Sequence, residues 1–203
     1  MAGDAALLSL MRAIVAGDPS KIPADLAAAT LDRGASRQDP KTYFFDAIRH
    51  SVYAGDTALH VAAAAHREKT ARRLIALGAD VHARNRRGDA ALHYAVDGIP
   101  GSRCWNPAAQ TATIACLLGA GADPNAADKG GTTPLHRAIR NRCAAAVRAL
   151  LDGGADPRQN NGSGSSPRLL ATKTTGRGGS GSAEAKAEQA EILRLLDLHG
   201  AVR

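Results

Sequence analysis

The sequence predicts an all-α solenoid: a stack of about five helix–turn–helix repeats joined by β-turn fingers, with three inserts. Three observations lead to this prediction. A four-residue motif recurs from positions 57, 90, 133 and 166, at spacings of 33, 43 and 33 residues. A Gly-Ala pair recurs at positions 34, 78, 121, 154 and 200. Hydrophobic residues make up 44% of the chain and aromatic residues only 3%, which favours a thin core between closely packed, alanine-rich helices.

The most regular copy of the repeat runs from Gly121 to Ala138 and reads GADPNAADKGGTTPLHRA. Its Gly-Ala-Asp ends one helix, residues 128–131 form a tight turn, and Thr133-Pro134-Leu135-His136 begins the next helix. Thr-Pro-Leu-His-x-Ala at a period of 33 residues is typical of ankyrin repeats. The chain therefore resembles the ankyrin repeat family, most specifically between Thr57 and Asp156.

This resemblance implies a single ankyrin-repeat domain over residues 1–203. Because terminal repeats cover the open ends of a stack, they depart from the consensus. The expected segments are N-terminal cap helices at 1–36, an aromatic insert at 37–54, repeats at 55–87, 88–130 and 131–163, and a C-terminal capping repeat at 164–203. Within the cap we expect helices at Ala5–Ala16 and Pro23–Leu31. The spacings between the two markers place further inserts at 98–107 and 172–182.

The aromatic insert is the sharpest local change in composition. It holds both phenylalanines and two of the three tyrosines, which are Tyr43, Phe44, Phe45 and Tyr53. We expect an added turn or short helix that buries these rings against the first repeats, because aromatic side chains contribute large core area. The alternative is an exposed aromatic contact patch.

Recurring histidines suggest a metal site at first sight. His60, His93 and His136 each occupy the last position of the motif, but no repeat supplies a second ligand at suitable spacing. The resemblance implies that they hydrogen-bond the backbone of the adjacent turn. Cys104, Cys116 and Cys143 show no CxxC spacing, so neither a zinc site nor a disulfide framework is indicated. We therefore expect no metal and no cofactor.

Catalysis is not predicted either. The recurring histidines belong to the repeat, and no cysteine has an evident activating base. A glycine-rich stretch at 176–181 precedes a predicted helix, yet it lacks the Gly-Lys-Ser/Thr and the preceding strand of a phosphate-binding loop, so a flexible surface loop is favoured.

Charge indicates the kind of partner. The net charge is +7 and the isoelectric point about 9.8, which favours acidic partners. An unidentified protein with an acidic surface is the first expectation, and nucleic acid or another polyanion bound through the arginine-rich surface is the alternative. The sequence has no stretch long and apolar enough to cross a membrane, no signal peptide and no paired cysteines, which predicts a cytoplasmic protein.

In the ankyrin family, partners commonly bind the turn tips and the inner, concave face of the first helices. The positions that correspond here are predicted to be exposed and to bind the partner. They are Arg86, Arg87, Asp89, Asp97, Lys129, Thr132, Arg140, Asn141 and Lys173.

The inserts at 98–107 and 172–182 share one edge of the stack, so their loops could meet there. We hypothesise a basic rim at this edge that is specific to this protein. Its candidate residues are Arg103, Trp105, Arg142 and Arg177.

Overall fold

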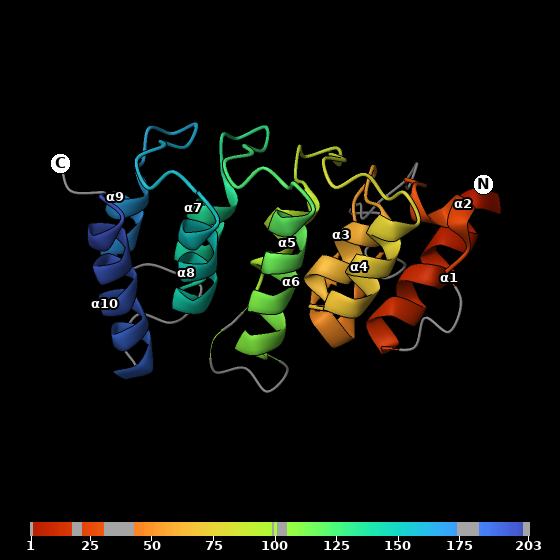
Figure 1. The fold of residues 1–203 in the computed structure, drawn as a ribbon, viewed down its shortest axis with the longest axis horizontal. Coiled ribbons are helices and arrows are strands. Elements are labelled where there is room, and N and C mark those ends of the chain that lie inside the picture. The colour runs from red at the N-terminus through yellow and green to blue at the C-terminus, as the bar shows by residue number, and fades with distance from the viewer. Residues whose placement is uncertain are drawn as a thin grey trace.

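The chain folds into an elongated row of helices that stand side by side along the long axis of the molecule (Figure 1). This computed structural model describes residues 2–17, 22–30, 43–98, 100, 105–173 and 183–200. Five helix pairs follow one another within these residues, and the predicted helical solenoid is confirmed. The pairs are α1 (Ala2–Ala16) with α2 (Ala24–Ala27), α3 (Ala58–Ala64) with α4 (Glu68–Ala76), α5 (Ala91–Ala95) with α6 (Pro107–Gly119), α7 (Pro134–Arg140) with α8 (Ala144–Asp152), and α9 (Pro167–Thr172) with α10 (Ala183–Leu198).

The helices form two layers. In the first layer α3, α5, α7 and α9 contact one another in that order, and in the second α4, α6, α8 and α10 do the same. The apolar core lies between the layers and is built mostly from alanine, leucine and isoleucine side chains. We call the outer side of the first layer the first-helix face.

Local chemistry explains where the first helices begin. The hydroxyl of Thr133 accepts a hydrogen bond from the backbone N–H of His136, whose Nδ1 accepts the N–H of Thr133 in return at 3.2 Å. Thr57 and His60 form the same reciprocal cap. Such caps satisfy backbone donors that a helix leaves unpaired in its first turn.

The histidines also link neighbouring repeats. Nε2 of His60 donates to the carbonyl of Asp89 at 3.1 Å, and Nε2 of His93 donates to the carbonyl of Thr132 at the same distance. The predicted structural role is thus confirmed for these two residues.

The fingers project from the same long edge of the stack, at one end of the helices (Figure 1), and contact each other through backbone hydrogen bonds. Within one finger, the Asp128 carboxylate accepts the N–H groups of Gly130 and Thr132, both at 2.8 Å. Between fingers, the N–H of Lys129 donates to the carbonyl of Arg87 at 3.0 Å. These bonds fix the spacing of the repeats at their tips.

The cap and the aromatic insert differ in detail from expectation. Helix α2 has four residues, fewer than the predicted Pro23–Leu31. The described part of the insert is a β-hairpin, in which β1 (Phe44–Phe45) pairs antiparallel with β2 (His50–Ser51) across a 3-10 turn at Asp46–Ile48. Phe45 is buried in the core, Tyr43 and Tyr53 pack partly against it, and Phe44 is exposed.

Candidate partner-binding cleft

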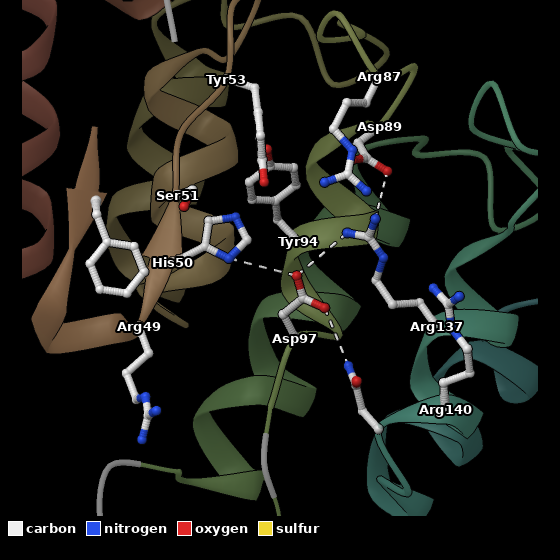
Figure 2. Close-up of a pocket in the computed structure, with 12 residues that line it drawn as sticks. Arg49, His50, Ser51, Tyr53, Arg87, Asp89, Tyr94, Asp97, Arg137 and Arg140 are labelled. Carbon is white, nitrogen blue, oxygen red and sulfur yellow. Dashed lines mark hydrogen bonds and ion pairs between the residues drawn. The ribbon is translucent and has the colours of Figure 1, made fainter. Parts of the chain in front are cut away.

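A cleft of about 510 Å³ lies on the first-helix face between the hairpin and the helices α5 and α7 (Figure 2). Residues from three consecutive repeats supply its lining. The hairpin and the residues after it contribute Phe44, Arg49, His50, Ser51 and Tyr53; the finger before α5 contributes Arg87 and Asp89; α5 and the turn after it contribute Tyr94 and Asp97; α7 and its C-cap contribute Arg137, Arg140 and Asn141.

A buried ion-pair network joins α7 to the preceding repeat. Nη2 of Arg137 donates to Oδ1 of Asp89 at 2.8 Å, and its Nη1 lies 3.4 Å from Oδ2 of Asp97. The Asp89 side chain is 1% exposed and that of Arg137 9%. Burial opposes the charge on Arg137, but the carboxylates of Asp97 and Asp89 outweigh it and raise the pKa of the guanidinium. Arg137 therefore pairs with both cleft carboxylates.

Asp97 also holds the hairpin and α7 in place. Its Oδ1 accepts a hydrogen bond from Nδ2 of Asn141 at 3.2 Å, and its Oδ2 lies 3.7 Å from Nδ1 of His50. The His50 ring meets the Tyr94 ring edge-on, with 4.3 Å between centroids. Burial lowers the pKa of His50 despite the nearby carboxylates of Asp97 and Asp56, so the imidazole is neutral at pH 7.

A second buried network lies beneath the cleft. The hydroxyl of Tyr94 donates to Oδ2 of Asp56 at 2.9 Å, and Nδ2 of Asn85 donates to Oδ1 of the same carboxylate at 2.9 Å. The backbone N–H of Tyr53, at the end of the insert, donates to Asp56 as well. Burial, followed by the adjacent Asp56 carboxylate, raises the pKa of Tyr94, which keeps its hydroxyl protonated. These hydrogen bonds fix Tyr94 and the backbone of Tyr53, which both line the cleft, to the buried Asp56.

The rim of the cleft is positive. Arg49, Arg87 and Arg140 are exposed, and the guanidinium of Arg87 lies 4.9 Å from the centre of the Tyr53 ring. With four arginines against two aspartates and a neutral His50, the cleft carries a net charge of +2. An anionic group is thus electrostatically favoured at its mouth.

Five of the predicted binding residues meet in this cleft: Arg87, Asp89, Asp97, Arg140 and Asn141. Three of them are not exposed as expected, and one is Asp97, which is half-buried and contacts Arg137 and Asn141. Asp89 is buried and forms an ion pair with Arg137. Asn141 is also buried, and its side-chain amide donates hydrogen bonds to the carbonyl of Val96 and to the carboxylate of Asp97. The remaining four lie elsewhere: Arg86, Lys129 and Thr132 on the fingers, and Lys173 after α9.

The structure describes two of the four insert-edge candidates, Trp105 and Arg142, and neither of these two is exposed. Arg142 is buried, and its Nη1 donates to the carbonyl of Ala185 in α10 at 3.3 Å, so it ties repeat four to repeat five. Trp105 is half-buried and donates from Nε1 to Gln110 at 2.9 Å. Arg103 and Arg177 lie outside the described residues, as do half of the positions at 98–107 and most of those at 172–182.

Sequence reasoning missed Arg49, His50 and Arg137 as cleft residues. The aromatic concentration around Phe44 and Tyr53 was the one signal that pointed to the hairpin. Within the described residues, no group of three or more His, Cys, Asp or Glu side chains is placed to hold a metal ion. No helix in the same part of the chain is long and apolar enough to span a bilayer.

Comparison with known proteins agrees with the architecture. Two family models, both described as "Ankyrin repeats (many copies)", match residues 43–98 and 117–171. Together they cover more than half of the chain, and the chain belongs to the ankyrin repeat family, whose repeats are general protein–protein interaction modules.

Two curated relatives are similar to about half of the chain. "Ankyrin repeat and SOCS box protein 16" of Mus musculus is 42% identical over 113 residues, which are 55% of this chain and 24% of that protein. Its Homo sapiens counterpart is 40% identical over 114 residues, again 55% of this chain and 24% of the relative. The match thus spans about a quarter of the length of either relative.

Proposed function

We propose that this chain is a non-catalytic scaffold that binds a partner protein through the first-helix face and the finger tips, and that the bound surface is acidic. The observation that carries the proposal is the cleft, where Arg87 and Arg140 both line a positive rim above a hydrogen-bonded polar network. Because the fingers and first helices are fixed by hydrogen bonds, association would order few groups and lose little conformational entropy.

The groups that would perform catalysis are engaged in structure. His60 and His93 cap helices and bridge repeats. Cys143 is buried, and that burial raises the pKa of its thiol to about 11, which disfavours the nucleophilic thiolate. A cytoplasmic location is part of the same proposal, because it suits a protein partner and free thiols such as Cys116 and Cys143.

Affinity capture with charge-reversed variants tests the function. The test variant changes Arg86, Arg87, Lys129 and Arg140 to Glu, and a matched control changes Lys69, Arg73, Arg148 and Lys186, on second-layer helices, to Glu. We expect a protein from source-cell lysate to be retained by the parent and the control and lost by the test variant, with circular dichroism unchanged in all three. Equal retention by both variants would contradict the proposal.

Nucleic-acid binding is the second candidate, favoured by the net charge of +7. It predicts retention of nucleic acid rather than protein, with an affinity that falls steeply as salt rises. Weak binding that is insensitive to salt would exclude it.

A further inference from the structure

We infer that the hairpin at residues 43–53 determines which partner the cleft accepts: a protein segment in which an acidic side chain neighbours a large apolar one. This inference rests on the proposed function, since it assumes that the partner is a protein bound on the first-helix face. It specifies the side chains that the bound segment carries and the hairpin residues that would contact them.

The apolar half of the inference comes from the two phenylalanines of β1. Successive side chains of a strand point to opposite sides, and here Phe45 enters the core while Phe44 lines the cleft with 38% of its surface exposed. Tyr53 lines the same cleft beneath the guanidinium of Arg87. An apolar side chain placed against Phe44 and Tyr53 would remove both from water.

The acidic half comes from Arg49. This residue ends the 3-10 turn with a φ of 49°, and its N–H donates to the carbonyl of Asp46. Glycine adopts this left-handed conformation without steric cost and arginine does not, so the backbone alone gives no reason for a guanidinium here. The Arg49 side chain is exposed, and no ion pair involves it among the described residues.

The carboxylates inside the cleft are paired with residues other than Arg49. Asp89 and Asp97 form ion pairs with Arg137, and Asp97 also accepts a hydrogen bond from the amide of Asn141. Figure 2 shows Arg49 on the hairpin side and Arg140 on the α7 side, with Asp97 between them. A carboxylate that arrives at the hairpin therefore meets a cation that the protein does not neutralise.

The cleft has a volume of about 510 Å³ and is open on one side, so it can receive a few side chains of a partner segment.

The hairpin is also held rigidly in place, which allows it to discriminate between partner segments. His50 packs on Tyr94 and faces Asp97, and the N–H of Tyr53 is fixed by the buried Asp56. The cleft wall is thus formed before a partner arrives, which lowers the cost of binding.

Selection of peptides on the full chain tests the inference. The probe is a phage-displayed library of random 12-residue peptides, followed by fluorescence-anisotropy titration of the enriched sequences. The test variants are Arg49→Gly, which keeps a residue suited to positive φ, and Phe44→Ser. The matched controls are Arg73→Gln and Leu77→Ser on the second layer, where both parent side chains are exposed.

We expect enriched peptides to carry Asp or Glu beside Leu, Ile, Phe or Trp. Arg49→Gly and Phe44→Ser should each weaken binding about tenfold, the loss expected for one charge-assisted or apolar contact, while the controls bind as the parent does. Melting temperatures close to that of the parent would show that the variants are folded.

The inference is overturned if no peptide is enriched, if enriched peptides lack acidic residues, or if the hairpin variants bind as the parent does. A different contrary result is that acidic peptides bind the hairpin variants as tightly as the parent and lose affinity only for Arg87→Glu and Arg140→Glu. That result would overturn the inference and leave the proposed function standing. In the affinity capture, loss of the lysate partner by the charge-reversed second-layer control, and not by the test variant, would contradict the proposed function itself.

Discussion

Replacing Arg137 with Met should destabilise the protein strongly, because it leaves the carboxylate of Asp89 buried without its cation. The Asp89 side chain is almost inaccessible, and apart from Arg137 the nearest cation to it among the described ion pairs is Arg87, at 3.6 Å and half exposed. Breaking a buried ion pair by removing one partner costs about 3–5 kcal/mol. Since domains are stable by roughly 5–15 kcal/mol, the expected loss is a large part of the whole.

Urea unfolding followed by circular dichroism measures this loss. The double variant Arg137→Met/Asp89→Asn removes both charges, so its cost should be clearly smaller than the sum of the two single costs. As a control, Arg148→Met breaks the exposed pair with Glu191 and should cost no more than about 1 kcal/mol. A cost below about 1 kcal/mol for Arg137→Met, or additive single and double costs, would refute this reading of the network.

Three further predictions concern stability and reactivity. Burial, then the nearby Arg137, lower the pKa of His93 from 6.5 to about 4, so the unfolded chain binds more protons between these values. The free energy of unfolding should therefore fall by about 3 kcal/mol, as the contribution of this residue, when the pH falls from 6.5 to 4. Urea unfolding repeated across that pH range should show a smaller fall in His93→Gln. Gly131→Ala should destabilise the folded protein by several kcal/mol, because a Cβ at this position would lie 2.3 Å from the next finger. At Gly154 a Cβ would meet nothing within 4 Å, so Gly154→Ala should cost only about 1 kcal/mol, for its positive φ. Iodoacetamide at pH 8, followed by mass spectrometry, should label the half-exposed Cys116 before the buried Cys143.

Each of these has a clear contrary result. An unfolding free energy that rises toward pH 4, or that falls equally in His93→Gln, would contradict the buried neutral imidazole. Equal losses in the two glycine variants would contradict the tight approach between fingers. Labelling of Cys143 at the rate of Cys116 would show that the former is accessible.

The regular features of the fold were predictable because they are encoded locally. A threonine and a histidine three residues apart set the start of a helix, and a glycine after each second helix supplies the positive φ that ends it, as at Gly78 and Gly121. These signals act within one turn of helix. They recur at the repeat length, so the number and order of helix pairs could be read from the sequence.

The hairpin could not be predicted in the same way. Its strands are two residues long, too short for an alternating pattern, and only the cluster of aromatic residues marked the segment. That Phe44 faces the cleft while Phe45 enters the core follows from strand geometry, which a turn or helix would not impose.

The network in the cleft depends on distant partners. Arg137 pairs with Asp89 across 48 positions, and Arg142 contacts Ala185 across 43. Asn141 and Arg142 sit in a turn, which normally faces water, yet the neighbouring repeats cover them. Arg140, in the same run, remains exposed. Which turn residues face solvent was set by packing between repeats, a contact that local pattern does not contain.

The most direct test of the central claim is photo-crosslinking from the cleft wall. p-Benzoylphenylalanine in place of Phe44 lies in the cleft, and the same group in place of Leu77 lies on an exposed second-layer position. After irradiation in source-cell lysate, we predict a crosslinked partner from position 44 that is absent from position 77 and is lost when Arg49 and Arg140 are changed to Glu. A partner crosslinked from position 77 and never from position 44 would contradict binding in the cleft.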